Sequence, residues 1–238
     1  MNLHKDKNLF QKILQSTSDL IGLPLSLIEK DYWRMYTLFL VIHEPIGADT
    51  VLKGGMALSK CFRLIERIPD DIDLVISRRE GETDSKLKSK LKQVCNAITL
   101  ELPEIGIEGI TQKRGMNRKT AHSYYSQDNE NYDQQKNLVT IDYSWLGCDR
   151  PYNILKLNSV IGESLIQTNQ ATLIEQFALF PFAVKILDHY RTFCEKIMSL
   201  VRFSYSSTPI IDLKDKVKHC YDIYQLLRYC IFRSKLTP

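Results

Sequence analysis

Two glycines and two aspartates in one short segment have the types and spacing for phosphate chemistry. Residues 52–77 read LKGGMALSKCFRLIERIPDDIDLVIS. Gly54 and Gly55 permit a turn in which the backbone approaches a phosphate closely, and a helix after them would supply free N–H groups and a partial positive charge. Asp71 and Asp73 alternate with apolar residues, so both carboxylates lie on one face of a predicted strand.

Carboxylates on one strand face suit Mg²⁺, with Mn²⁺ as an alternative, because these ions take oxygen ligands and Mg²⁺ bridges to substrate phosphates. Residues 138–145, LVTIDYSW, form a second alternating strand. Its Asp142 is the candidate for a third metal-binding carboxylate in a displacement at phosphorus, the alternative being a polar residue on a half-exposed strand. Taken singly, the glycines are typical of a simple turn and the aspartates of a solvated face. Their joint occurrence favours a nucleotide and metal site.

Hydrophobic periodicity predicts the elements that must position these side chains. Helices are expected over residues 7–21, 24–44, 85–102, 190–203 and about 213–232, and from Met56 onward. Strands are expected over 50–52, 71–77 and 138–145, and a long loop or weak hairpin over 112–137. This order predicts an α+β fold with a small strand-rich region, flanking helices and a mostly helical part after a boundary near residue 160.

Composition and charge are those of an ordinary globular protein. The 238 residues are 44% hydrophobic and 25% charged, and the net charge of +4 permits a polyanionic partner without requiring one. Six scattered cysteines and five histidines show no zinc-ligand spacing, so we expect buried, reduced thiols and histidines at ordinary surface or interface positions. No apolar stretch has the length of a membrane span and no signal peptide is apparent, so we expect a cytoplasmic protein without membrane contact.

A basic, tyrosine-rich segment lies between two of the predicted strands. Its basic and aromatic residues are Lys113, Arg114, Arg118, Lys119, Tyr124, Tyr125 and Tyr132. Lysine and arginine contact RNA phosphates, and tyrosine rings stack on bases. The segment therefore suits RNA, with a merely solvated loop as the alternative.

Four sequence blocks, in order, resemble the AbiEii/AbiGii toxin family of the DNA polymerase β-like nucleotidyltransferase superfamily. The blocks are IEKDYW (28–33), LKGGMALSK with RIPDDIDL (52–74), YRTFCEKIMSL (190–200) and KHCYDIYQLL (218–227). The resemblance implies a polymerase β-like nucleotidyltransferase core with a small mixed sheet in residues 1–160. It also implies a C-terminal helical region in residues 161–238 that completes the active-site cleft.

The resemblance also implies residue roles. It implies that Gly54 and Gly55 line the triphosphate turn with Lys60 nearby. Ser59 is a further candidate, because it lies with Lys60 in about the first turn of the predicted helix. Those implied for catalysis are Asp71, Asp73, Asp142, Lys196 and Asp222, of which the first three would hold the metal ions. Lys196 lies among apolar helix positions, which favours a side chain that faces a cleft. An ion pair with Lys218, one turn earlier, is the alternative explanation of Asp222.

The implied activity is Mg²⁺-dependent transfer of a nucleoside monophosphate from a nucleoside triphosphate (NTP) to an acceptor hydroxyl, with tRNA or another RNA as acceptor. The protein would be the toxin of a bacterial toxin–antitoxin or abortive-infection system with a cognate antitoxin. Three positions depart from the family pattern. Met56 stands where the pattern has Thr or Ser, Pro69 where it has Ser, and Lys218 where it has Arg. A catalytically silent nucleotide-binding module and a transferase with a protein or small-molecule acceptor are the alternatives.

Overall fold

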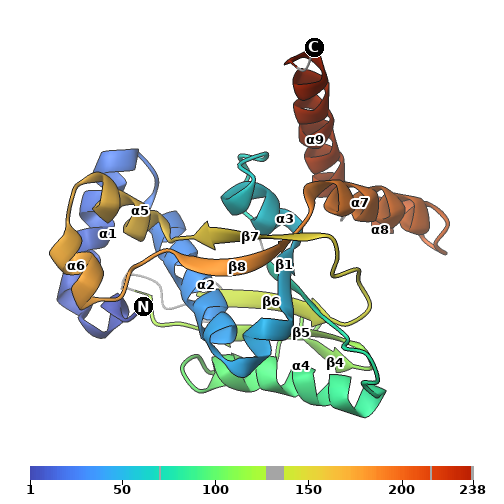
Figure 1. Cartoon of the computed structure of the whole chain (residues 1–238), viewed down its shortest axis with the longest axis horizontal. Coiled ribbons are helices and arrows are strands. Elements are labelled where there is room, and N and C mark those ends of the chain that lie inside the picture. The colour runs from blue at the N-terminus through green and yellow to red at the C-terminus, as the bar shows by residue number, and fades with distance from the viewer. Residues whose placement is uncertain (70, 127–136, 215, 237–238) are drawn as a thin grey trace.

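The computed structural model (Figure 1) describes residues 1–69, 71–126, 137–214 and 216–236, without the side chains of Arg114 and residues 230–236. These residues form a mixed sheet of eight strands with helices around it. The strands are β1 (Thr50–Lys53), β2 (Asp71–Ile76), β3 (Glu104–Ile105), β4 (Gln112–Arg114), β5 (Asn117–Ser123), β6 (Leu138–Ser144), β7 (Tyr152–Leu157) and β8 (Phe182–Leu187). Their order is β3-β5-β6-β2-β1-β8-β7, and β4 pairs with β5. The predicted α+β class is confirmed.

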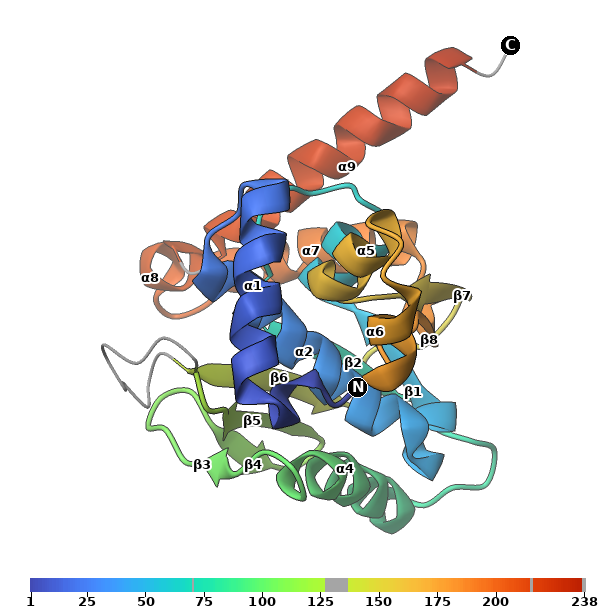
Figure 2. The ribbon, with the colours of Figure 1, turned by 90° about the vertical axis from the view of Figure 1, so that its left-hand side faces the viewer.

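Helices surround the sheet and extend beyond it. The α-helices of the described residues are α1 (Lys7–Ile21), α2 (Leu25–His43), α3 (Gly54–Met56), α4 (Asp84–Thr99), α5 (Val160–Gln167), α6 (Ala171–Gln176), α7 (His189–Ser204), α8 (Pro209–Lys214) and α9 (Val217–Leu236). Short 3₁₀ turns lie at Leu3–Lys5 and Pro45–Asp49, and a π-helix spans Ala57–Cys61. Figure 2 shows that α9 projects away from the rest of the fold.

Strand pairing brings the two aspartate-bearing strands together in the sheet. β2 runs parallel to β6 and antiparallel to β1, and β1 runs parallel to β8. Ile72, Leu74 and Ile76 are buried on one face of β2, whereas Asp71 and Asp73 on the other face are partly exposed. β6 shows the same alternation. The predicted alternation is therefore confirmed in both strands.

The apolar side of the sheet forms the main core with α2 and α4. Ile72 and Leu74 belong to the same buried cluster as Met35 and Leu38 of α2 and Leu91 of α4. Burial of these side chains is the main stabilising contribution to the fold and leaves the opposite sheet face for polar groups.

Local signals explain the helix boundaries that match the prediction. Asp6 caps α1 by accepting a hydrogen bond from the Leu9 backbone N–H at 3.0 Å, and Gly22 ends it with a φ of 70°. The side chain of Thr83 caps α4 in the same way as that of Asp6 caps α1. Such caps satisfy N–H groups that have no partner within the helix, and glycine adopts positive φ without a Cβ clash.

Three parts of the sheet and its connections differ from the sequence expectation. β8 lies between β1 and β7, although it falls in the part expected to be mostly helical, and its residues alternate buried and exposed with a period of two. The sheet therefore continues past residue 160, and the division at that residue stays a prediction. Residues 112–123 form a hairpin, as one of the two expectations for this segment allowed, but its strand β5 also pairs along the whole of β6, which was not expected. The helix expected from Met56 is instead α3 followed by the π-helix.

Cysteine burial is a further correction. Of the described cysteines, Cys95 is buried, whereas Cys148, Cys194 and Cys220 are exposed. His122 is not a surface residue but fully buried, with both ring nitrogens hydrogen-bonded. None of the described helices is long and apolar enough to cross a membrane.

Candidate active site

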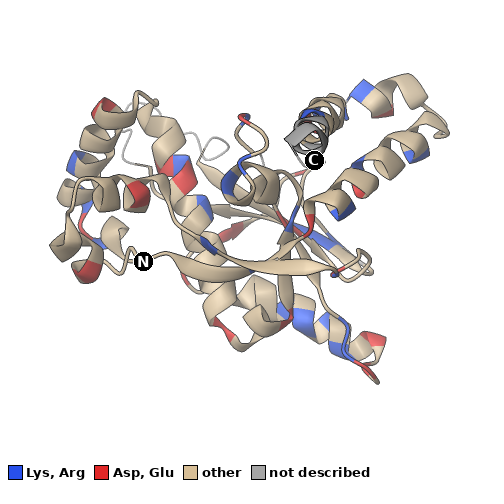
Figure 3. Cartoon of the chain, turned by 45° about the horizontal axis from the view of Figure 1, so that its top comes forward, with Lys and Arg blue, Asp and Glu red and all other residues tan. Residues whose placement is uncertain are grey.

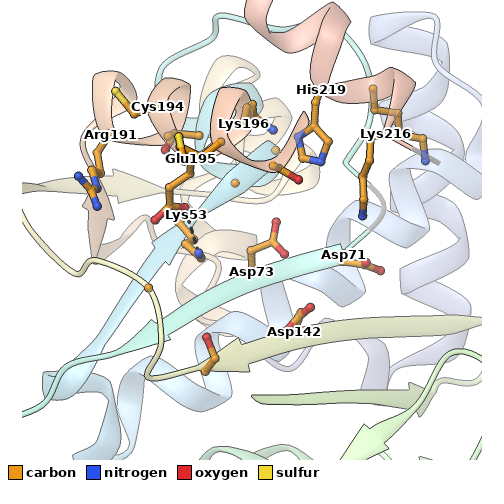
Figure 4. A pocket seen from close by; sticks show the side chains of 18 of the residues that line it. Lys53, Asp71, Asp73, Asp142, Arg191, Cys194, Glu195, Lys196, Lys216 and His219 are labelled. Atoms are coloured by element: carbon orange, nitrogen blue, oxygen red, sulfur yellow. Dashed lines mark hydrogen bonds and ion pairs between the residues drawn. The ribbon is translucent and has the colours of Figure 1, made fainter. Parts of the chain in front are cut away.

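The floor of the candidate site is a row of four charged side chains on four neighbouring strands. Asp73 on β2 pairs in register with Asp142 on β6. Lys53 on β1 is the partner of Asp73 on one side, and Lys119 on β5 is the partner of Asp142 on the other. Side chains in register point to the same sheet face, here the face opposite the main core. Figure 4 shows Lys53, Asp73 and Asp142 on this face.

The two central carboxylates of the row are destabilised in their charged form. Burial raises the pKa of Asp73, and the neighbouring Asp142 raises it further, to about 7. Burial also raises the pKa of Asp142, opposed by Lys119 and Lys53 and reinforced by Asp71. Both pKa values stay raised although neighbouring lysines lower them, so the pair retains the capacity to bind a further cation.

Asp71, two residues before Asp73 on the same strand face, is held by two hydrogen bonds. Lys119 Nζ donates to Asp71 Oδ2 at 2.5 Å, and Thr140 Oγ1 donates to Asp71 Oδ1. Burial alone would raise the pKa of Asp71, but the bonds from Lys119 and Thr140 lower it below its ordinary value. Asp71 is therefore ionised and already paired with a cation.

The Gly54–Gly55 turn brings the backbone against the same carboxylates. Gly54 has a φ of 69°, and a Cβ at this position would overlap the Asp73 carboxylate. A Cβ on Gly55 would lie 3.0 Å from Nη2 of Arg67. The absence of side chains at both positions therefore permits an aspartate and an arginine to approach the turn closely.

A buried ion cluster connects the loop before β2 with α7 and α9. Asp222, whose side chain is fully buried, accepts hydrogen bonds from Arg67 Nε at 2.8 Å and Nη2 at 2.6 Å. Its Oδ2 also lies 2.8 Å from Lys196 Nζ. Burial would raise the pKa of Asp222, but Arg67 and Lys196 lower it. Asp222 therefore positions two cations, a role that an ion pair with Lys218 alone would not explain.

These groups line a cavity of about 870 Å³ between the sheet and the C-terminal helices. Eight Lys or Arg and four Asp or Glu side chains line it. Three of the acids are the aspartates of β2 and β6, and the fourth is Glu195, which pairs with Lys53 at 3.0 Å. The cations contributed by α7, by the turn before α9 and by the start of α9 are Arg191, Lys196, Arg202, Lys216 and Lys218. Figure 3 shows basic positions recurring along α7. An acidic floor beneath a basic wall suits a polyphosphate bound with a metal ion.

Comparison with known proteins identifies the family. A family model described as nucleotidyl transferase AbiEii toxin, type IV toxin–antitoxin system, matches residues 38–237. The chain belongs to the AbiEii toxin family. No curated protein matches the sequence. The predicted family is thereby confirmed: the protein is a nucleotidyltransferase, with a nucleotide substrate and, as a toxin of such a system, a cognate antitoxin.

Two of the residues expected near the triphosphate of this AbiEii protein lie elsewhere. Lys60 Nζ is 2.7 Å from Asp31 Oδ1 on α2, and neither Ser59 nor Lys60 lines the described cavity. The expectation assumes a regular α-helix from Met56, whereas a π-helix carries both residues and Asp31 pairs with the lysine. In this structure Lys60 therefore acts as a link to α2 and not as a cavity cation.

Four of the charged cavity residues outside the sequence-predicted active-site set make the contacts described above, namely Lys53, Arg67, Lys119 and Glu195. Three of them have a sequence signal, because Lys53, Arg67 and Glu195 fall inside the AbiEii-like blocks. The sequence suggests Lys119 only as an RNA contact, since its strand β5 lies in the segment predicted as a loop or weak hairpin. Only the pairing of β5 with β6 brings it to the site.

The basic segment around β5 is largely engaged within the protein. Lys113 and Lys119 form ion pairs with carboxylates, and Tyr124 is buried by stacking on an α2 tryptophan. Tyr132 and the side chain of Arg114 lie outside the described residues. RNA contact through this segment stays a prediction.

The carboxylates of the AbiEii site fit a divalent metal ion. Mg²⁺ is commonly held by one or two protein carboxylates together with substrate phosphates and water. Asp73 and Asp142 offer two such oxygen donors, and Asp71 lies beside them in contact with Lys119. Throughout the described part of the chain, no group of three or more His, Cys, Asp or Glu side chains is arranged to hold a metal ion. Asp73 and Asp142 thus fit the ion, whereas Asp71 could join them only after leaving Lys119.

Proposed function

We propose that this AbiEii toxin transfers a nucleoside monophosphate from an NTP to the hydroxyl group of an RNA acceptor, with tRNA as the first candidate, in a Mg²⁺-dependent reaction. The observation that carries the proposal is the in-register pair of Asp73 and Asp142 on the floor of a cavity with a basic wall. In this reaction the acceptor oxygen bonds to the α-phosphorus, and the bond to pyrophosphate breaks.

The three aspartates are proposed to bind the metal ion and to accept the proton of the attacking hydroxyl. Asp73 and Asp142, joined by Asp71, are the proposed ligands of Mg²⁺ or Mn²⁺, which when bound supplies positive charge beside the transferring phosphoryl group. Asp142 is also the proposed acceptor of the proton from the attacking hydroxyl, because it lies on the cavity floor in register with Asp73.

The cations act on the phosphates. Arg67 and Lys196, positioned by Asp222, stabilise the charge that develops on departing pyrophosphate. Gly54 and Gly55 allow the triphosphate to approach the backbone, since a side chain at either position would meet Asp73 or Arg67.

The cavity mouth supports a polyanionic acceptor. Arg191, Arg202 and Lys218 are exposed and line the cavity beyond the predicted triphosphate contacts. Contacts between such cations and RNA phosphates weaken steeply as salt concentration rises. Acceptor binding should therefore fall with salt if the acceptor is RNA and change little if it is a small neutral molecule.

The experiment is a transfer assay with each of the four α-labelled NTPs, Mg²⁺ and total bacterial RNA. The unmodified chain is compared with Asp73→Asn and with Asp19→Asn, an exposed aspartate on α1 that does not line the cavity. We expect label in a discrete tRNA-sized band from the unmodified chain and from Asp19→Asn, and none from Asp73→Asn.

Other outcomes correct defined parts of the proposal. Label on protein or on a small molecule would keep the chemistry and change the acceptor. Label that persists in Asp73→Asn would overturn the assignment of the site. NTP binding without transfer to any acceptor would identify a chain that binds nucleotide but has lost the reaction.

A further inference from the structure

Lys119 reaches across one strand to contact the carboxylate on the next. Its backbone pairs with Asp142 on β6, yet its Nζ lies 2.5 Å from Oδ2 of Asp71 on β2. Burial would lower the pKa of Lys119, but Asp71, Asp142 and Asp73 all raise it, and the net direction is upward. The ammonium group therefore interacts with every carboxylate proposed as a metal ligand.

The second lysine of the row is engaged elsewhere. Lys53 Nζ lies 3.0 Å from Oε2 of Glu195 on α7, so part of its charge is compensated by a residue outside the aspartate group. Lys119, in contrast, forms its ion pair with Asp71 itself. Of the two lysines in the row, Lys119 is thus the one that neutralises a proposed metal ligand directly.

We infer that Lys119 is an internal counter-cation that competes with the divalent metal ion for Asp71 and so sets the metal concentration at which the site fills. The inference rests on the proposed function, because it takes the three aspartates as the metal ligands. An ammonium group and a divalent cation on one carboxylate repel each other at short range, so Asp71 can join the metal only when Lys119 moves.

The side chain of Lys119 has space to move away from Asp71. Its side chain is 30% exposed and it lines the cavity, so its flexible four-carbon stem can carry the ammonium group away from the sheet without crossing the core. Asp71 keeps its bond from Thr140 Oγ1, which holds the carboxylate in place while the lysine leaves.

The test is direct Mn²⁺ binding to the full chain without nucleotide, measured from the electron paramagnetic resonance signal of free Mn²⁺. Lys119→Met removes the competing charge, and Lys119→Arg retains it. Lys113→Met is the matched control, because Lys113 also pairs with a carboxylate, Glu104 at 2.7 Å, but does not line the cavity. We expect Lys119→Met to bind Mn²⁺ about tenfold more tightly than the unmodified chain. Lys119→Arg and Lys113→Met should bind Mn²⁺ with the affinity of the unmodified chain.

A thermal measurement covers the case in which Lys119→Met does not fold. The melting temperatures of Lys119→Gln and of the unmodified chain are compared in EDTA and in Mn²⁺. Lys119→Gln should have the lower melting temperature in EDTA and the larger rise in melting temperature when Mn²⁺ is added. A larger gain from Mn²⁺ is not expected if the lysine has only a structural role.

The contrary outcomes separate the inference from the proposed function. Unchanged or weaker Mn²⁺ binding in Lys119→Met, with binding abolished by Asp73→Asn, would overturn the competition while leaving the metal site intact. Mn²⁺ binding that survives Asp73→Asn would overturn the metal site and the inference together.

Discussion

Asp73 on β2 and Asp142 on β6 face each other in register across parallel strands, although the two strands come from distant parts of the chain. The charge of Asp142 raises the pKa of the buried Asp73 carboxyl further, so a change at Asp142 alters the titration of Asp73. This relationship governs both the activity expected of the site and the stability of the metal-free protein.

Asp73→Asn separates activity from stability. We expect the variant to lose at least about 100-fold in transfer rate, since it removes a group that acts on transition-state charge. Its melting temperature in EDTA should equal or exceed that of the unmodified chain, because the substitution removes a buried charge and its repulsion with Asp142. Pyrophosphate release and thermal unfolding measure the two effects. A variant that is both inactive and less stable would show that Asp73 has a structural role.

The raised pKa of Asp73 predicts the pH dependence of metal-free stability. Its pKa rises from 3.8 in the unfolded chain to about 7 in the folded protein, so between these values the folded state holds a proton that the unfolded state has lost. The contribution of Asp73 therefore falls as pH rises from 4 to 7, by at most about 1.4 kcal/mol per pH unit, and is constant above that range.

Aspartates with a lowered pKa, such as Asp71 and Asp222, contribute stability that increases as pH rises, opposite to Asp73. Comparison of the unmodified chain with Asp73→Asn isolates the contribution of Asp73 from theirs. Urea unfolding in EDTA at several pH values should give a free-energy difference between the variant and the unmodified chain that grows in favour of the variant toward pH 7. A difference independent of pH would contradict the raised pKa.

Asp222→Asn tests the buried ion cluster. The substitution leaves Arg67 and Lys196 without their shared counter-charge, so we expect a loss of about 3 kcal/mol in the free energy of unfolding. Asp84→Asn, which breaks the exposed pair with Arg78, should cost less than about 1 kcal/mol. Urea denaturation measures both variants. Equal losses would show that Asp222 contributes no more than a surface ion pair.

Gly54→Ala tests the close approach of the turn to Asp73. Gly54 and Gly81 have similar φ values of 69° and 76°, but an added Cβ overlaps the Asp73 carboxylate at Gly54 and meets nothing within 4 Å at Gly81. Gly81→Ala should therefore cost only the backbone strain of about 1–2 kcal/mol and keep full activity. Gly54→Ala should lower the free energy of unfolding by more than this and should also reduce the rate of nucleotidyl transfer. Similar effects of the two substitutions on activity would show that the space at Gly54 has no functional role.

Several features of the protein follow from local sequence alone. The period of two along β2 and β6 places Asp71, Asp73 and Asp142 on polar strand faces, because successive side chains of any strand point to opposite sides. The helices α1, α2 and α4 follow from apolar spacing with recognisable ends. These properties depend on neighbours a few residues apart, so they can be read without knowing the rest of the fold.

Other features needed the tertiary structure. Arg67 and Asp222 meet although 155 residues separate them, and Lys119 reaches Asp71 only because β5 pairs beside β6. Lys60 has the sequence position of a phosphate ligand but pairs with Asp31. Local pattern thus determined which side chains were available for chemistry, whereas strand register and helix docking decided which of them meet. Register and docking depend on packing between distant segments, and a one-residue slip in either would bring different charges into the cavity.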